Sequence, residues 1–112
     1  MTSHLEQALA QQIAWAGLPQ PIQEYRAIPG RRFRWDFSWP ERKLMLEVQG
    51  GIFGKKSGHN TGVGILRDME KLNEATCAGW RCLKVSGDHI DSGQALRWIQ
   101  IALAMVEIEP KI

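Results

Sequence analysis

A chain of 112 residues is long enough for a single hydrophobic core, and we expect one domain over residues 1–112. Hydrophobic residues make up 44% and charged residues 23% of the chain, ordinary globular values that argue against disorder. The net charge of +2 neither demands nor excludes a nucleic-acid partner, so the distribution of charge has to decide. The most apolar stretch, residues 99–108, is interrupted by Gln100 and Glu107 and is too short to span a membrane.

The two cysteines, Cys77 and Cys82, do not have the spacing of a zinc site, and no signal peptide is recognisable at the start of the chain. We therefore expect both to be reduced, small core residues rather than partners in a disulfide. Together with the missing membrane span, these features predict a cytoplasmic, intracellular protein.

The chain is expected to begin with a helix. Ser3 and Glu6 have the spacing of a capping box, and Gly17 and Pro19 end the pattern. In a capping box the Glu6 carboxylate returns to the backbone of Ser3, which requires no further role. The apolar residues that follow keep helical spacing: Leu5, Leu9, Ile13 and Ala16.

Three strands are expected next. Residues 22–28 form the first, and Pro29 with Gly30 signals a turn. Every second residue from 33 to 39 is aromatic, which predicts a strand that buries one face. The opposite face carries Arg34, Asp36 and Ser38, which we expect to point away from the core. Residues 44–49 alternate in the same way after a turn over residues 40–43.

A four-residue turn sets the register of this hairpin. Trp39 then faces Leu44, so Asp36 lies opposite Glu47 with roughly 5 Å between their Cβ atoms. Like charges in that position repel and need a compensating cation, and oxygen ligands suit Mg²⁺ or Mn²⁺. Such a metal would activate water and hold a phosphodiester. The alternative is an exposed hairpin whose acids are solvated or paired with Arg34 and Lys43.

Basic residues gather around these acids. Arginines precede the acidic pair and would neutralise phosphates, or else form a solvated basic edge: Arg26, Arg31, Arg32 and Arg34. Six of the 11 glycines lie between residues 50 and 64, in an expected loop with Lys55, Lys56 and His59. This loop would close over a nucleic-acid backbone, although His59 also fits a plain loop residue. The segment lacks the spacing of a phosphate-binding loop, so we expect no nucleotide cofactor.

Residues 65–78 are expected to form a helix that Gly79 ends, with an inward stripe of Ile65, Met69, Leu72 and Thr76. On this helix Lys71 would pair in solvent with Asp68 or Glu74. A strand over residues 80–86 would then run parallel to its neighbour. The order of elements predicts an α/β sandwich with a mixed central sheet flanked by helices.

The last helix is expected to begin at a Ser92 cap and to run to about residue 106. One apolar stripe packs on the sheet, and a second must be covered by something else: Trp98, Ile101, Ala102 and Met105. A second copy of the chain would cover it in a homodimer. Alternatively the loop of residues 50–64 folds over the helix and the protein stays monomeric.

The acidic hairpin lies within a longer series of matches to a known family. The matching residues are Glu24 to Arg26, Pro29, Arg31 to Pro40, Leu44, Glu47 to Gly51, Gly58, His59, Gly62, Gly64, Asp68 to Lys71, Asn73 to Ala75, Gly79 to Arg81, Ser92 and Gly93. In this order and over nearly the whole chain, they closely resemble the virus-type replication-repair nuclease (VRR-NUC) domain of the PD-(D/E)XK superfamily.

The resemblance implies a restriction-endonuclease-like fold and a Mg²⁺- or Mn²⁺-dependent endonuclease that hydrolyses DNA phosphodiesters. It implies that Asp36, Glu47 and the carbonyl of Val48 bind the metal, with Glu6 as a further contributor. It also implies that Arg67 and Lys71 lie on the substrate side. Small stand-alone relatives imply a homodimer that cuts branched DNA such as four-way (Holliday) junctions in DNA repair, and a phage or prophage origin.

Gln49 departs from the superfamily pattern, which has Lys at this position. An ammonium stabilises negative charge or exchanges a proton, whereas a neutral amide only orients water by hydrogen bonds. The expected catalytic set is therefore Asp36, Glu47 and Gln49, with Lys71 as a possible substitute cation. The competing hypothesis is a weakly catalytic or non-catalytic module that binds branched DNA and leaves cutting to a partner.

Overall fold

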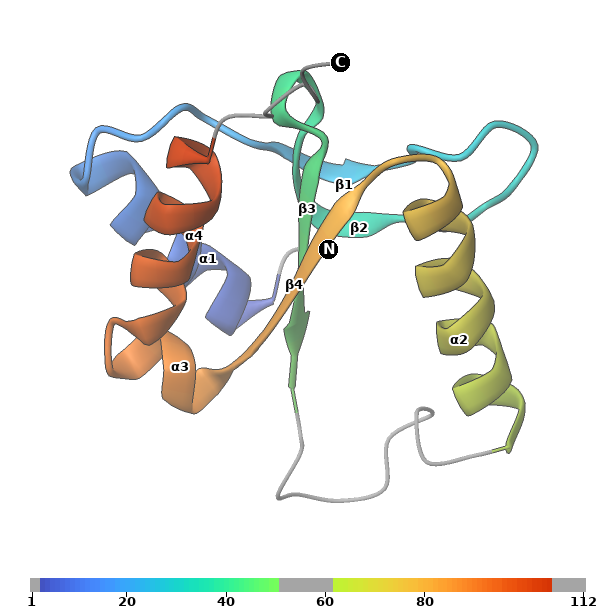
Figure 1. The fold of residues 1–112 in the computed structure, drawn as a ribbon. Coiled ribbons are helices and arrows are strands. Elements are labelled where there is room, and N and C mark those ends of the chain that lie inside the picture. Colours follow the sequence, from blue (N-terminus) through green and yellow to red (C-terminus); the bar gives the residue numbers. More distant parts are fainter. Residues whose placement is uncertain (1–2, 51–61, 106–112) are drawn as a thin grey trace, which may run out of the picture.

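The computed structural model describes residues 3–50 and 62–105. Within them, four strands form one mixed sheet in the order β1-β2-β3-β4, with helices on both sides (Figure 1). The predicted α/β sandwich is confirmed. The elements are α1 (His4–Trp15), β1 (Ile22–Tyr25), β2 (Trp35–Trp39), the short 3-10 helix η1 (Pro40–Arg42), β3 (Leu44–Gln49), α2 (Gly62–Cys77), β4 (Arg81–Ser86), α3 (Gly87–Asp91) and α4 (Gln94–Ala104).

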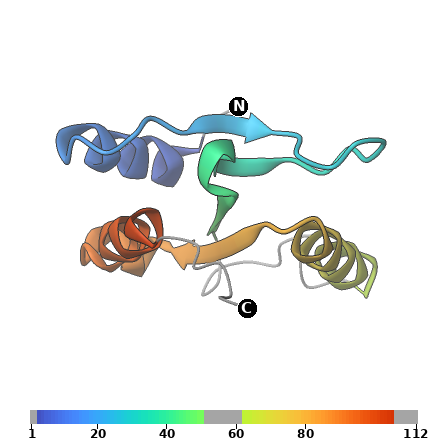
Figure 2. The ribbon, with the colours of Figure 1, turned by 45° about the horizontal axis from the view of Figure 1, so that its top comes forward.

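The helices divide between the two faces of the sheet. Helices α1, α3 and α4 cover one face, and α2 covers the other (Figures 1 and 2). The larger core lies under α1 and α4 and includes Leu9, Phe37, Leu46 and Ile99. A smaller cluster lies under α2: Trp35, Met45, Ala75 and Trp80. Because β3 and β4 are parallel, α2 is the crossover between them, as expected.

The predicted hairpin register is confirmed. Trp39 pairs with Leu44 and Phe37 pairs with Leu46 in the antiparallel β2–β3 ladder. The turn is tight because Lys43 adopts left-handed backbone angles (φ 50°) and its N–H donates to the carbonyl of Pro40 at 3.1 Å. The described ladder ends at the Phe37–Leu46 pair, so the predicted Asp36–Glu47 pair is not part of it.

The expected division of β2 into a buried and an open face is wrong. Trp35 packs in the cluster under α2, whereas Phe37 packs under α1 and α4. Ser38 is fully buried, because α2 covers the face that we expected to be open. The first strand is also shorter than predicted and ends at Tyr25, after Glu24 takes a positive φ of 52°.

The predicted inward stripe of α2 is wrong as well. The less exposed positions of this helix are Gly64, Asp68, Lys71, Glu74 and Ala75, of which only Ala75 is buried. The apolar side chains point outward, with Val63 72%, Leu66 61% and Met69 55% exposed; Ile65 and Leu72 are also exposed. Periodicity locates a stripe on a helix, but it does not say which stripe faces the sheet.

The C-terminal part differs from the prediction in its helix boundaries. Ser86 caps an extra short helix, α3, and Ser92 is the C-cap residue of that helix. Gly93, with φ 84°, precedes α4, and the Ser92 hydroxyl accepts a hydrogen bond from the Gln94 N–H at 3.3 Å. A five-residue helix is too short for its periodicity to be recognised in the sequence.

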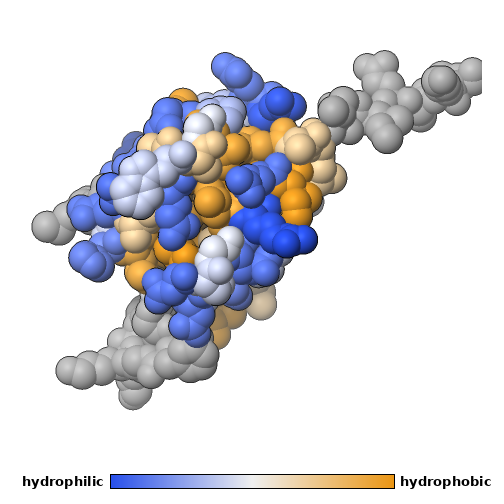
Figure 3. Space-filling view, turned by 90° about the vertical axis from the view of Figure 1, so that its left-hand side faces the viewer, coloured by the Kyte–Doolittle hydropathy of each residue, from blue (hydrophilic) through white to orange (hydrophobic). Residues whose placement is uncertain are grey.

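The second apolar stripe of α4 is largely covered by the chain itself. Ala102 is buried, and Trp98 packs on the core with its ring 4.9 Å from that of His89. Ile101 and Met105 remain exposed. On this side of the molecule, polar side chains interrupt the apolar surface (Figure 3). The chain therefore covers part of this stripe and leaves Ile101 and Met105 open, and the homodimer stays a prediction.

Both cysteines are free, but they are not both core residues. Cys77 is exposed and Cys82 is partly buried. Burial and the nearby Glu47 carboxylate raise the pKa of the Cys82 thiol. Within residues 3–50 and 62–105, no helix is long and apolar enough to cross a membrane.

Candidate active site

The site begins where β2 and β3 stop pairing. Beyond the Phe37–Leu46 pair, the Asp36 side chain takes the place of a backbone partner, and its Oδ2 accepts the Val48 N–H at 2.7 Å. This contact holds a half-buried carboxylate against the outer half of β3.

The electrostatic environment of Asp36 disfavours its charge. Burial, hydrogen bonding to the Glu6 side chain and the charges of Glu6 and Glu47 raise the pKa of Asp36 from its ordinary 3.8 to about 7. The hydrogen bond from the Val48 N–H works in the opposite direction. A cation beside Asp36 would favour the charged form of its carboxyl. That a metal shared with Glu47 supplies this cation stays a prediction.

Glu6 forms the helix cap that the sequence predicted, and its role as a metal ligand stays a prediction. The capping box is present, because the Ser3 N–H donates to Glu6 Oε2 at 2.8 Å and the Glu6 N–H donates to Ser3 Oγ at 3.1 Å. The same side chain also faces Asp36 across the gap between α1 and β2. Glu6 therefore caps α1 and adds negative charge beside Asp36.

A divalent metal requires several oxygen, nitrogen or sulfur donors that point to one place. Among residues 3–50 and 62–105, no three His, Cys, Asp or Glu side chains converge closely enough to hold a metal ion. Mg²⁺ is nevertheless commonly bound by one or two carboxylates, with waters and substrate phosphates completing its shell. Asp36, Glu47 and the Val48 carbonyl are hard oxygen donors of this kind, and burial, followed by the neighbouring Glu6 and Glu47, raises the pKa of Asp36. The residues present fit such an ion.

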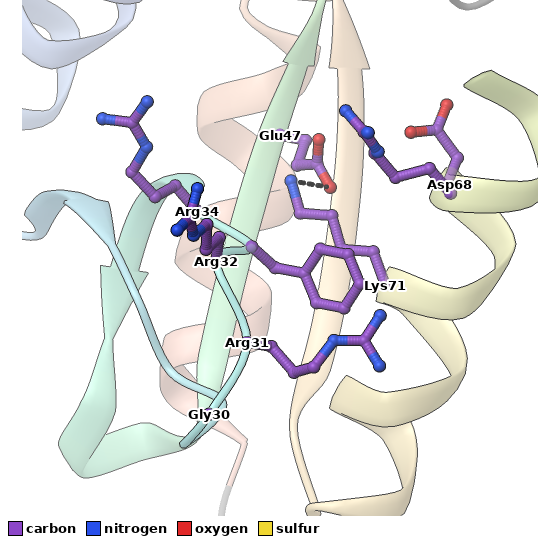
Figure 4. A pocket seen from close by; sticks show the side chains of 9 residues that line it. Gly30, Arg31, Arg32, Arg34, Glu47, Asp68 and Lys71 are labelled. Carbon is purple, nitrogen blue, oxygen red and sulfur yellow. Dashed lines mark ion pairs between the residues drawn. The ribbon is translucent and has the colours of Figure 1, made fainter. Parts of the chain in front are cut away.

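Glu47 already has a cationic partner. Lys71 Nζ lies 3.1 Å from Glu47 Oε1, and the two side chains are 13% and 21% exposed. The ammonium also lies 4.8 Å from the centroid of the Trp35 ring. Lys71 thus reaches from α2 to β3 (Figure 4), whereas the sequence had suggested Asp68 or Glu74 as its partners. Gln49 is half-buried at the end of β3, paired in register with Ser86.

A cavity of about 700 Å³ opens beside this ion pair. One wall is the segment from Gly30 to Arg34 and the other is α2 (Figure 4). Arg31 stacks 4.4 Å from the Phe33 ring centroid and pairs with Glu74 at 2.9 Å and Glu70 at 3.1 Å. Five of the nine lining residues are cationic: Arg31, Arg32, Arg34, Arg67 and Lys71. The other four are Gly30, Phe33, Glu47 and Asp68.

The structure brings together only part of the predicted DNA-binding set. Arg31, Arg32, Arg34 and Arg67 line the cavity, and Arg34 lies 3.9 Å from Glu24. Arg26 is exposed and lies outside this lining. Lys55, Lys56 and His59 lie outside the described residues, and the expected loop ends earlier than predicted because Gly62 and Gly64 belong to α2.

Sequence reasoning missed the contributions of Phe33 and Asp68 to the cavity. Phe33 had been assigned to the core, yet it packs in the cluster under α2 and supports Arg31. Asp68 and Lys71 are three residues apart and therefore share one face of α2. That spacing was available in the sequence, but the side of the helix that faces the sheet was not.

The fold was compared with known proteins. No protein-family model matches the chain, and no curated protein matches it. Among solved structures, it is similar to the catalytic domain of the homing endonuclease I-Bth0305I, with a TM-score of 0.66 and 18% sequence identity. The similarity covers 89% of this chain and 93% of that one. The chain therefore has the fold of that endonuclease domain.

Proposed function

We propose that this protein is a metal-dependent DNA endonuclease of the VRR-NUC type. The observation that supports it best is the cluster of acids at the end of the β2–β3 ladder. There Asp36 hydrogen-bonds with the Glu6 side chain and is affected by the charge of Glu47, and a cavity is lined by Glu47 and four arginines. The likeness to a homing endonuclease catalytic domain adds a fold on which nuclease sites are built. Fold alone does not assign an activity, so the proposal depends on the acids.

In this proposal Asp36, Glu47 and the Val48 carbonyl hold Mg²⁺ or Mn²⁺, with Glu6 supporting them. A metal bound by these residues would polarise the phosphate and lower the pKa of an attacking water. The Val48 N–H fixes one oxygen of Asp36, so the carboxylate does not have to reorganise when it is used. Gln49 orients water by hydrogen bonds.

The cavity binds the DNA backbone. The arginines that line it bind the phosphates: Arg31, Arg32, Arg34 and Arg67. Contacts of this kind supply affinity that does not depend on the base sequence. We also propose that Lys55, Lys56 and His59, which lie outside the described residues, contribute to phosphate binding. Branched DNA such as a four-way junction is the proposed substrate, in a DNA-repair setting inside the cytoplasm of a phage- or prophage-bearing cell.

We place the second copy of a homodimer on the outer face of α2. Ile65, Met69 and Leu72 follow one another at intervals of four and three residues on that face and are exposed. This spacing is the seam of a helix pair. A twofold axis there would present two sites to two strands of a symmetric junction.

A second candidate is a DNA-binding module without cutting activity of its own. Two observations favour it: no trio of metal-binding side chains converges in the described part of the chain, and Lys71 already neutralises Glu47. Such a module would bind branched DNA through the same arginines and leave cleavage to a partner.

Cleavage by the purified protein separates the two. We expect cutting of a labelled four-way junction with Mg²⁺ or Mn²⁺, and none with EDTA. Asp36→Asn and Glu47→Gln should each lower the rate by more than about 100-fold, the scale of losing a central electrostatic contributor. Glu41→Gln is the matched control, because Glu41 is exposed on η1 and should cut at the wild-type rate. Binding without metal-dependent cleavage would instead support the module.

A further inference from the structure

One residue of β1 has a backbone conformation that is foreign to strands. Glu24 has a φ of 52°, in the left-handed region. Regular pairs with β2 lie on both sides of it: Gln23 with Phe37, and Tyr25 with Trp35. In this register Glu24 would face Asp36, and the described ladder skips that pair. The β1–β2 ladder is therefore interrupted at Asp36.

The interruption coincides with a change in the face that β2 presents to each core. In an unbroken strand, residues two positions apart lie on the same face of the sheet. Trp35 nevertheless packs in the cluster under α2, while Phe37 packs in the core under α1 and α4. The strand therefore turns over between these two residues, and Asp36 is the residue at which it does so.

This turn-over directs the Asp36 side chain toward β3. In a regular strand the side chains stand roughly perpendicular to the sheet, whereas the backbone N–H groups donate within its plane. Asp36 Oδ2 accepts the N–H of Val48 at 2.7 Å, so its carboxylate lies where a backbone carbonyl of β2 would otherwise be. The contact between Asp36 and β3 therefore depends on the break in the pairing with β1.

The residue type at position 24 does not account for the conformation. Glycine, asparagine and aspartate are the residues that favour a positive φ, and glutamate is not one of them. The Glu24 carboxylate lies 3.9 Å from Arg34, but the two side chains are 42% and 56% exposed, and a pair of this kind contributes little to stability. Sparsely populated backbone conformations persist where the surrounding structure imposes them, and they gather at functional sites.

We propose that Glu24 is a positioning residue for Asp36. Its left-handed backbone keeps the β1–β2 ladder open at this point and thereby holds the Asp36 carboxylate on the Val48 N–H. The effect on catalysis rests on the nuclease activity proposed above, whereas the effect on the hydrogen bond does not. Glu24 acts through Asp36 and not on the substrate.

Substitutions at position 24 separate the role of the backbone from that of the side chain. Valine strongly disfavours a positive φ, so Glu24→Val should make the strand regular, close the pair with Asp36 and release the Val48 N–H. Glycine adopts this φ freely, so Glu24→Gly should keep the break although it removes the carboxylate. Gln23→Val is the matched control, because Gln23 is an exposed and regularly paired neighbour in the same strand.

Amide exchange followed by NMR in the metal-free protein reports on the hydrogen bond. Exchange of the Val48 N–H should be at least about tenfold faster in Glu24→Val, and within about threefold of wild type in Glu24→Gly and Gln23→Val. In cleavage assays Glu24→Val should lower kcat by at least about tenfold and change KM by less than about threefold, because Asp36 is displaced while the arginines stay in place. Glu24→Gly should keep kcat within about threefold of wild type.

The outcomes distinguish this inference from the proposed function. If the wild type does not cut, the proposed function fails, and faster exchange in Glu24→Val alone would still support the placement of Asp36 by Glu24. Unchanged exchange of the Val48 N–H in Glu24→Val would refute the inference whether or not the protein cuts. Faster exchange with an unchanged kcat would refute the positioning role in catalysis.

The glycine variant provides a further way to refute the inference. An equal loss of kcat in Glu24→Gly and Glu24→Val would assign the effect to the carboxylate, against a role of the backbone. Circular dichroism checks the fold of each variant. If Glu24→Val does not fold, Glu24→Ala, which also disfavours a positive φ, takes its place in the comparison with Glu24→Gly.

Discussion

Asp36 makes the stability of the metal-free protein depend on pH in a defined direction. Because the folded pKa is raised from 3.8 to about 7, ionising Asp36 costs more in the folded than in the unfolded state. The free energy of unfolding is therefore highest below pH 3.8, where Asp36 is protonated in both states, and it falls as the pH rises through about 7. Asp36→Asn removes this loss while keeping an acceptor oxygen for the Val48 N–H.

The size of the effect follows from the shift. A pKa raised from 3.8 to about 7 corresponds to about 4 kcal/mol at a pH well above 7. That is an upper value, because Asp36 is only half-buried and the Glu6 side chain is able to move away. We expect Asp36→Asn to be about 1–3 kcal/mol more stable than wild type at pH 8 and within about 0.5 kcal/mol of it at pH 4.

Urea unfolding in EDTA at pH 4, 6 and 8 measures this difference. Glu41→Gln, which removes an exposed carboxylate on η1, should show no comparable dependence on pH. Adding Mg²⁺ at pH 8 should stabilise the wild type more than Asp36→Asn, since an ion that binds the folded state raises its free energy of unfolding. A variant that is less stable than wild type at pH 8, or a difference that does not change between pH 4 and 8, would show that Asp36 is not electrostatically disfavoured.

Two further predictions concern binding and assembly. Arg32 lines the cavity, so Arg32→Ala should reduce the steepness of the plot of log DNA affinity against log salt concentration by about one. Arg26 lies outside the lining, and Arg26→Ala should leave that slope unchanged. Filter binding at several salt concentrations compares the two variants. Met69→Glu on α2 should convert the dimer to a monomer in light scattering at micromolar concentration, whereas Ile101→Glu on α4 should leave the dimer intact. A monomeric wild type would refute the dimer. A dimer that Ile101→Glu breaks would refute its placement on α2.

The hairpin was predictable because its register depends on local chemistry. Four residues between Trp39 and Leu44, with Pro40 at the start and Lys43 in a left-handed conformation, fix the pairing without help from the rest of the chain. The register does not extend to Asp36, whose carboxylate accepts the Val48 N–H beyond the last pair of the ladder. The capping box of α1 was predictable for the same reason, since its hydrogen bonds join residues only three apart.

The contacts that depend on packing could not be predicted in this way. Alternation along β2 suggests one buried face, but α2 covers the other face as well, so Ser38 is buried and Trp35 joins a second cluster. The Lys71 to Glu47 ion pair joins residues 24 positions apart and depends on the rotation of α2 after the crossover. Nothing in the sequence of α2 alone specifies this rotation, because its apolar stripe is the stronger signal and points the wrong way.

The rotation of α2 links the proposed chemistry to the proposed assembly. Turning Lys71 toward Glu47 necessarily turns Met69 and Leu72 away from the sheet, since residues two or one positions apart on a helix point in different directions. Exposed apolar side chains of this kind cost free energy until a partner covers them. A second copy that packs on this face would therefore stabilise the rotation that keeps the ammonium in the cavity. In that case dimer formation would not only pair two sites but also hold each site in its working arrangement, and Met69→Glu should lower the cleavage rate along with dimerisation.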